Sequence, residues 1–137
     1  MIFSKVEQFF TRYAHVLNND DISTKRLNDY YSFPCILVLD EPQKVFAENN
    51  EFASVVKNVL HNYRALGVTT FIPQITKVLS VSTNMTYVAI QWSFKNEADE
   101  QVLCLSNSYL LSEIDENYKI VVLIVDEQDE IFQSQLT

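Results

Sequence analysis

The sequence predicts one α+β domain in which helices come first and a mainly antiparallel sheet follows. Apolar residues recur at helical spacing in three segments of the first half, 3–20, 24–31 and 49–66. From residue 68 onward the chain changes to four long runs that are rich in β-branched and aromatic residues and separated by short polar turns. The length of 137 residues suits one domain with its own core.

The first and third helical segments each carry a continuous apolar face. In the first, this face consists of Val6, Phe9, Phe10, Tyr13, Val16 and Leu17. Tyr13 is therefore expected to point inward and His15 to point away. In the third, the face consists of Phe52, Val55, Val56, Val59, Leu60, Tyr63 and Leu66. Ser23 is the expected N-cap of the second helix, and Gly67 the expected left-handed stop after the third.

A short hairpin is predicted between helices two and three. The apolar run 35–39 ends on Asp40, and a second strand around 44–47 is expected to pair with it across the turn 41–43. Alternation along the first strand puts Ile36, Val38 and Asp40 on one face and Cys35, Leu37 and Leu39 on the other. If the first face lines the core, Asp40 is a pocket carboxylate; otherwise Glu41 points inward instead.

The long strands, predicted within 69–82, 85–94, 101–114 and 118–127, are apolar on both faces. A sheet with one solvated face would show polar residues there. The helices are expected to cover one face, and a second copy of the chain is expected to cover the other as a homodimer. The acidic-polar tail, 127–137, is expected to be partly loose and to carry no chemistry.

Composition excludes several functions. Eighteen acidic against ten basic residues, a net charge of −8, argue against binding to nucleic acid or to anionic membranes. A single glycine cannot build a P-loop or a dinucleotide fingerprint. Two histidines, both predicted to point outward, make a metal site unexpected, and no cofactor is predicted. Two widely separated cysteines in apolar runs suggest buried, reduced thiols and a cytoplasmic location.

Two stretches resemble a known superfamily. "TRYAHVLNNDDIS" looks like the opening helix, and "SNSYLLSEIDENYKIVVLIVDE" like the closing hairpin, of the cone-shaped nuclear transport factor two, ketosteroid isomerase and SnoaL-like proteins. The resemblance spans about residues 3–126 of a single domain covering 1–137. It implies a cystatin-like cone, with three N-terminal helices packed on the concave face of a strongly bent sheet. In many relatives the interior is a mostly apolar pocket for small hydrophobic or aromatic molecules.

The isomerase branch of that superfamily suggests catalytic candidates. Tyr13 falls where a helix tyrosine helps to bind a developing oxyanion, and Asp40 falls near the position of the base. This chemistry needs a base that moves a proton α to a carbonyl and a donor that holds the enolate. The third catalytic group of the isomerase branch is a protonated acid on a later strand. This chain does not match it, because it has Asn107, Ser108 and Tyr109 there.

Three functions follow as alternatives. The first is a pocket protein without catalysis, which binds a small hydrophobic molecule through Tyr30, Val38, Tyr63, Gln91, Trp92, Asn107 and Tyr109. The second is a proton-transfer enzyme, an isomerase, dehydratase or cyclase, with Asp40 as base and Tyr13 as oxyanion donor. The third is an assembly module with a filled core that uses the outer sheet face. The enzyme requires a buried Asp40, the binding protein requires a cavity, and the assembly module requires an exposed apolar face.

Overall fold

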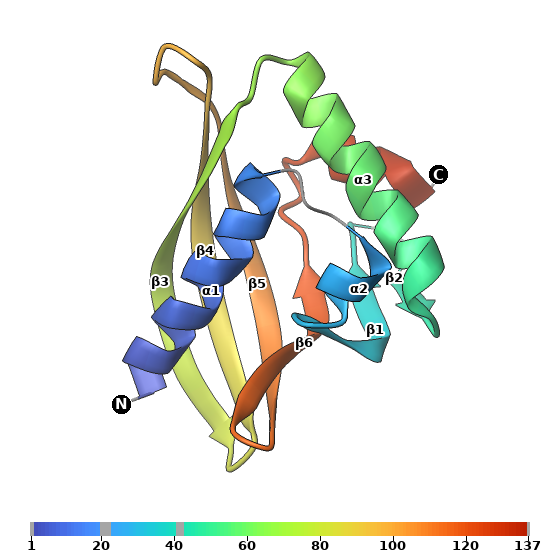
Figure 1. Ribbon diagram of the computed structural model, residues 1–137, viewed down its shortest axis with the longest axis vertical. Helices are drawn as coiled ribbons and strands as arrows, with labels where there is room; N and C mark the ends of the chain where they lie inside the picture. The colour runs from blue at the N-terminus through green and yellow to red at the C-terminus, as the bar shows by residue number, and fades with distance from the viewer. Residues whose placement is uncertain (1, 20–22, 41–42, 137) are drawn as a thin grey trace.

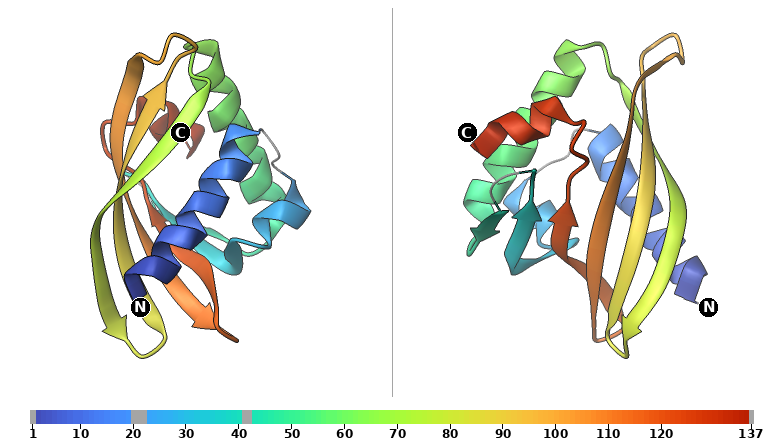
Figure 2. Two further views of the ribbon diagram at one scale, coloured as in Figure 1. Left: turned by 60° about the vertical axis from the view of Figure 1, so that its left-hand side comes forward. Right: turned by 180° about the vertical axis from the view of Figure 1, so that it is seen from behind.

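The structure, a computed structural model, describes residues 2–19, 23–40 and 43–136. Six strands form one sheet in the order β2-β1-β6-β5-β4-β3, and Figures 1 and 2 show the helices gathered on one side of it. The elements in chain order are α1 (Ile2–Asn18), α2 (Thr24–Leu27), β1 (Tyr31–Val38), β2 (Gln43–Phe46), α3 (Asn49–Ala65), β3 (Thr70–Ser82), β4 (Met85–Lys95), β5 (Gln101–Ile114), β6 (Asn117–Ile124), α4 (Glu130–Gln133) and a 3₁₀ turn (Ser134–Leu136).

The predicted α+β class is confirmed, and so are the four long strands and the antiparallel β1–β2 pair. The sheet is mainly antiparallel because only β1 and β6 run parallel among the described strands. β4 shows the expected alternation most clearly, since every second side chain from Thr86 to Phe94 is buried. None of the helices in the described parts of the chain has the length and apolarity needed to span a bilayer.

The helices differ from the prediction in number and in length. α2 has only four residues, because Asn28 and Asp29, which follow it, favour turns. It packs against α3. Asn49, at the start of α3, donates a hydrogen bond from its side chain to Asn28 Oδ1 at 2.9 Å and so holds this turn. A fourth helix, α4, forms in the C-terminal segment that was expected to be loose. The expected stop at Gly67 is confirmed, since its φ is +94°.

The end of α1 is tied to the start of the edge strand β3. The Asn18 side chain donates to the Phe71 carbonyl oxygen at 3.1 Å and accepts from the Phe71 N–H at 2.6 Å. This pair of bonds satisfies two backbone groups on the open edge of the sheet, where no further strand would do so. α1 is thereby held across the concave face of β3–β5 (Figure 2).

The two cysteines lie in different environments. Cys35 is fully buried, and burial raises the pKa of its thiol to about 12. Cys104 is exposed, so the expectation that both thiols are buried is wrong. The reason is strand alternation, because Leu105 takes the inward position next to it.

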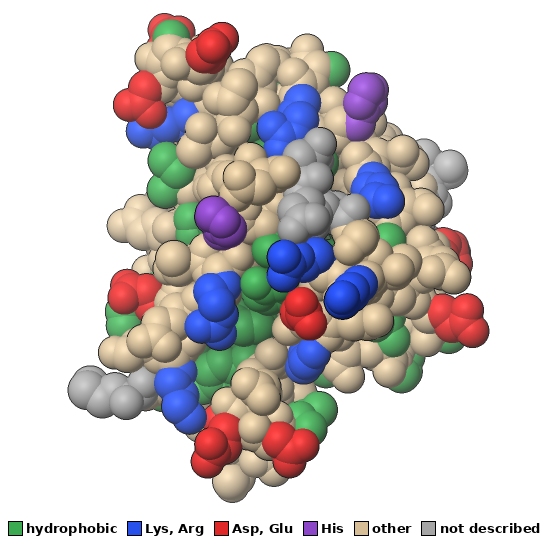
Figure 3. All heavy atoms as spheres, viewed as in Figure 1, with side chains coloured by type: hydrophobic (Ala, Val, Ile, Leu, Met, Phe, Trp, Pro, Cys, Tyr) green, Lys and Arg blue, Asp and Glu red, His purple; other side chains and the backbone are tan. Residues whose placement is uncertain are grey.

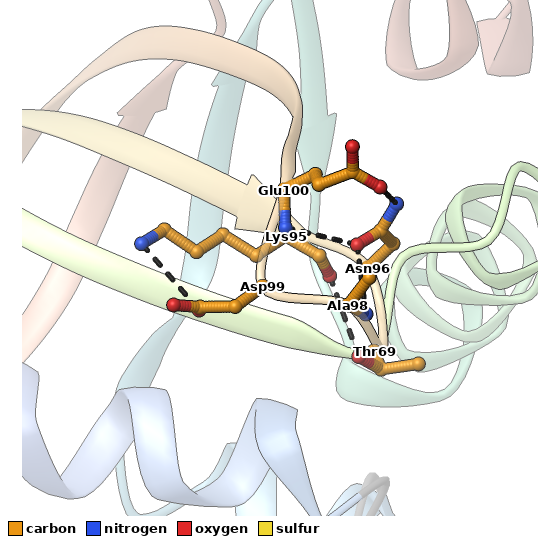
Figure 4. Close-up of polar contacts among 6 residues, drawn as sticks. All are labelled: Thr69, Lys95, Asn96, Ala98, Asp99 and Glu100. Atoms are coloured by element: carbon orange, nitrogen blue, oxygen red, sulfur yellow. Dashed lines mark hydrogen bonds and ion pairs between the residues drawn. The ribbon is translucent and has the colours of Figure 1, made fainter.

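The β4–β5 connection makes a tight turn without glycine (Figure 4). The Asn96 side-chain oxygen accepts from the backbone N–H groups of Ala98 at 3.0 Å and Glu100 at 2.9 Å, while its amide donates to the Glu100 carboxylate at 3.2 Å. Asp99 adopts a φ of +62° in this turn, a conformation that Asp tolerates better than most residues. One asparagine side chain therefore organises the loop.

We predict that Asn96→Ala lowers the free energy of unfolding by about 1–2 kcal/mol, because two backbone donors lose their acceptor. Urea denaturation followed by circular dichroism measures this. Asn84→Ala in the exposed β3–β4 turn is the matched control and is expected to change stability by less than about 0.5 kcal/mol. Equal effects of the two substitutions would contradict the role assigned to Asn96.

Candidate functional site

A small interior cavity of about 50 Å³ lies between α1, α3, α4 and the concave face of the sheet. Eight of its lining side chains are apolar: Leu17, Val56, Val59, Leu60, Phe71, Phe94, Leu123 and Phe132. Six carry a polar atom: Tyr13, Tyr31, Tyr63, Trp92, Asn107 and Tyr109. An apolar cavity with a few converging polar groups is the usual form of a small-molecule site.

Tyr13 and Tyr31 form a buried pair on one wall. Their hydroxyl oxygens are 2.6 Å apart and share a hydrogen bond in which either can donate. Burial raises the pKa of both hydroxyls, so both remain protonated. Because the shared bond uses only one proton, the other hydroxyl keeps a proton for a further acceptor, and the described residues supply none.

Tyr109 forms a second polar centre on β5. Trp92 Nε1 donates to the Tyr109 hydroxyl oxygen at 2.9 Å. Burial raises the pKa of Tyr109 to about 12, although the nearby Asn107 amide and Trp92 N–H both oppose the rise by favouring the phenolate. The oxygen thus acts as an acceptor, and its own proton has no acceptor among the described residues.

The cavity therefore presents two hydroxyl protons that lack a partner. Buried polar groups are nearly always hydrogen-bonded, to protein, water or ligand. The volume admits a few water molecules or an equally small group. This arrangement can bind an oxygen acceptor, such as a carbonyl, ether or phenol oxygen, inside an apolar shell.

The C-terminal segment closes the cavity on the side of α3. Tyr63 on α3 donates its hydroxyl proton to the Asp129 carboxylate, and Asp129 also accepts the Phe132 N–H at 3.0 Å as the N-cap of α4. Asp129 is only 3% exposed. Burial raises the pKa of its carboxyl, with a smaller contribution from Asp126, against the lowering effect of the hydrogen bonds from Tyr63 and Phe132.

Asp40 lies outside this site. Its side chain is exposed, while Leu37 and Leu39 point into the core, so the face that carries Asp40 is the outer one. Its backbone N–H donates to Gln133 Oε1 at 2.8 Å and helps to hold α4. The structure thus does not bring Asp40 to Tyr13, and the burial required of a base is absent. Glu41, the alternative, lies outside the described residues.

The structure places four of the seven predicted pocket residues in the cavity wall, namely Tyr63, Trp92, Asn107 and Tyr109. Val38 and Gln91 are half-buried on the outer face, because alternation cannot put neighbours such as Gln91 and Trp92 on the same side. Tyr30 borders a separate open groove between α1, α2 and β3 that Arg12 and His15 also line. Figure 3 views this face, where Lys and Arg side chains surround hydrophobic ones.

The sequence patterns do not assign Tyr31, Asp129 or Phe132 to the site, nor the apolar side chains of the cavity wall. The sequence pattern selects Tyr30 and not Tyr31, and it places Asp129 and Phe132 in the acidic-polar tail. A signal existed, because Asp129 precedes the apolar pair Ile131 and Phe132 at the spacing of an N-cap before a helical face. The short length of α4 hid it, since one turn does not establish a helical period.

The family model described as NTF2-like protein (DUF6841) matches residues 4–128, and the chain belongs to this family. This confirms the resemblance to the nuclear transport factor two-like and SnoaL-like superfamily. No curated protein matches the chain at a significant level.

Solved structures agree on the fold. An NTF-2 like protein of unknown function from Shewanella oneidensis MR-1 is 16% identical with a TM-score of 0.69, over 90% of this chain and 98% of that one. A cystatin-like domain of unknown function from Nostoc punctiforme is 11% identical with a TM-score of 0.67, over 91% and 76%. A ketosteroid isomerase-like protein from Erwinia carotovora atroseptica is 18% identical with a TM-score of 0.56, over 88% and 92%. At these identities the likeness is one of fold.

We predict that Asp129→Asn removes a loss of stability that the wild-type protein shows as pH rises. Because the folded-state pKa of Asp129 is raised, its contribution is fully present below the ordinary carboxyl pKa of about 3.9 and is lost as pH rises through the raised value. Asn can still cap α4 but has no proton to lose. In urea unfolding from about pH 4 to about pH 7, the free energy of unfolding of the variant should rise relative to that of the wild type. A constant difference would contradict this.

Proposed function

We propose that the protein binds a small hydrophobic or aromatic molecule with one hydrogen-bond acceptor inside the cone, without performing catalysis on it. The observation that carries the proposal is the pair of partnerless hydroxyl protons, one at Tyr109 and one in the Tyr13–Tyr31 pair, within an otherwise apolar cavity. A ligand oxygen that accepts from them relieves the cost of leaving them unpaired.

The lining of the cavity favours binding over proton transfer. Its described residues include no carboxylate and no histidine, and all of its tyrosine hydroxyls with shifted pKa values are held in the protonated form by burial. Such groups donate hydrogen bonds but do not act as a base near neutral pH. The fold family alone does not choose between these activities.

Phenol and toluene form a matched pair of probes, because they have nearly the same shape and only phenol offers an oxygen. We predict that phenol binds at least about tenfold more tightly, since toluene leaves the hydroxyl protons unpaired. The indole N–H resonance of Trp92, the single tryptophan, reports binding in an NMR titration. Equal affinities for the two probes, or no shift with either, would count against the proposal.

A cavity-filling variant and a surface variant provide the control. Val59→Leu adds one methylene group inside the cavity and is expected to weaken phenol binding at least about fivefold. Val45→Leu makes the same chemical change on β2, where Val45 is 61% exposed, and is expected to leave binding unchanged. If both variants bind phenol like the wild type, the ligand lies elsewhere.

The outer sheet face supports a second proposal, that two copies of the chain associate through it. One row of apolar side chains crosses all six strands in register, namely Val45, Ile36, Val122, Leu110, Tyr87 and Leu79. Leu79 is 51% exposed, and Ile124, outside the row, is 40% exposed. In Figure 2 the helices do not cover this face, and exposed apolar side chains that lie next to one another are typical of an interface.

We predict that the wild-type protein sediments as a dimer and that Leu79→Lys combined with Ile124→Lys shifts it to monomer, because two charges per chain would be buried. Leu66→Lys combined with Ile2→Lys, at exposed positions on the helices, is the matched control and is expected to leave the dimer intact. Sedimentation velocity distinguishes the species. A wild-type monomer at high micromolar concentration would contradict the proposal.

A further inference from the structure

The ring of Phe132 forms part of the cavity wall, although it comes from a one-turn helix at the end of the chain. It is 7% exposed. Tyr63, its neighbour in the wall, packs against Phe94 with ring centroids 4.8 Å apart, whereas the described residues give Phe132 no ring–ring contact. The Phe132 ring packs in the hydrophobic core, and α4 is the element that brings it there.

Polar contacts from Asp129 and Gln133 join α4 to the rest of the described chain. The Asp129 carboxylate accepts from Tyr63 and from the Phe132 N–H, and Gln133 accepts from the Asp40 N–H and donates to the Asp126 carbonyl oxygen at 3.1 Å. A helix of four residues has little stability of its own. Figures 1 and 2 show the C-terminal helix lying beside α3. Loss of these contacts would release the segment.

Burying the Asp129 carboxylate also costs free energy. Asp129 is the only acidic residue among the described ones that is buried, and none of the described basic residues forms an ion pair with it. The titratable groups that face it are Tyr63 from α3 and Asp126 from its own segment, and neither brings a positive charge. A buried carboxylate without a cation favours states in which it reaches water.

We propose that Phe132 is an internal occupant of the ligand site, and that a phenyl-sized ligand with an acceptor oxygen takes its place when the Tyr63–Asp129 bond opens and α4 moves away. This inference rests on the proposed binding function and adds the class of ligand and the route by which the ligand enters the cavity. The cavity of about 50 Å³ falls below the 300–1,000 Å³ of typical ligand pockets, so an aromatic ligand needs the space that the Phe132 ring fills. The Phe132 ring therefore indicates the size and shape of the ligand that would replace it.

Amide hydrogen exchange in the wild-type protein tests the displacement directly. The Phe132 N–H bonds to Asp129 Oδ1 at 3.0 Å and the Gln133 N–H to the Asp129 carbonyl oxygen at 3.0 Å, so both report the closed state of α4. Saturating phenol is expected to speed exchange at these two amides at least about fivefold. Slower exchange at both would show that phenol binds with α4 in place and would overturn the inference.

A pair of substitutions at Asp129 tests the same idea through affinity. Asp129 does not line the cavity, so its replacement acts through its two contacts, the cap of α4 and the Tyr63 hydroxyl. Asp129→Ala removes the cap of α4 and the contact with Tyr63. It is expected to tighten phenol binding about fivefold, because α4 is then displaced from the cavity in a larger fraction of the molecules. Asp129→Asn keeps both contacts without the buried charge, so it favours the closed state and is expected to bind phenol more weakly than the Ala variant and no more tightly than the wild type. Equal affinities of the Ala variant and the wild type would overturn the inference.

The results separate the two levels of the proposal. If phenol shifts the Trp92 resonance but the α4 amides stay protected from hydrogen exchange, the cavity binds the ligand. Only the displacement of Phe132 by the ligand is then wrong. If phenol binds neither the wild type nor Asp129→Ala, the proposed function fails as well. Exchange measurements on the wild type remain decisive even if the Ala variant folds poorly.

Discussion

The packing of α1 across the concave face of the sheet is the constraint on which the rest of the structure depends. The Phe10 ring lies 4.9 Å from that of Tyr109, and Asn18 holds the edge of β3 through two hydrogen bonds. With α1 fixed at both its middle and its end, Tyr13 is held against Tyr31 and Trp92. Tyr13, Tyr31, Trp92 and Tyr109 in turn form the aromatic part of the cavity wall.

Tyrosine hydroxyls in a core are costly unless they find partners, and this core contains four around one small volume. Apolar side chains of similar shape would pack with less cost. The arrangement is instead suited to recognition, because donors that lack an acceptor discriminate strongly between ligands with and without an oxygen. The NTF2-like fold supplies the shell, and the specific chemistry comes from Tyr13, Tyr31, Tyr109 and their neighbours.

The C-terminal segment connects the cavity to the surface. Gln133 contacts the backbone at the end of β1, Asp129 contacts α3, and Phe132 reaches the interior, so the state of α4 is coupled to three parts of the fold. Burial raises the pKa of Asp129, so the protonation of this carboxyl is linked to the stability of the fold. On the opposite side, the helices leave the apolar row of the sheet uncovered.

The sequence by itself determined the fold class, the order of the helices and strands as far as β6, the inward position of Tyr13 and the stop at Gly67, because periodicity and glycine conformation are local properties. It also indicated Tyr63, Trp92, Asn107 and Tyr109 as pocket residues, which lie in the cavity wall. Only the tertiary structure decided which face of β1 is buried, and with it the exposure of Asp40, because alternation defines two faces but not which one meets the helices. The burial of Asp129 likewise depends on α3, a long-range contact that no local pattern contains.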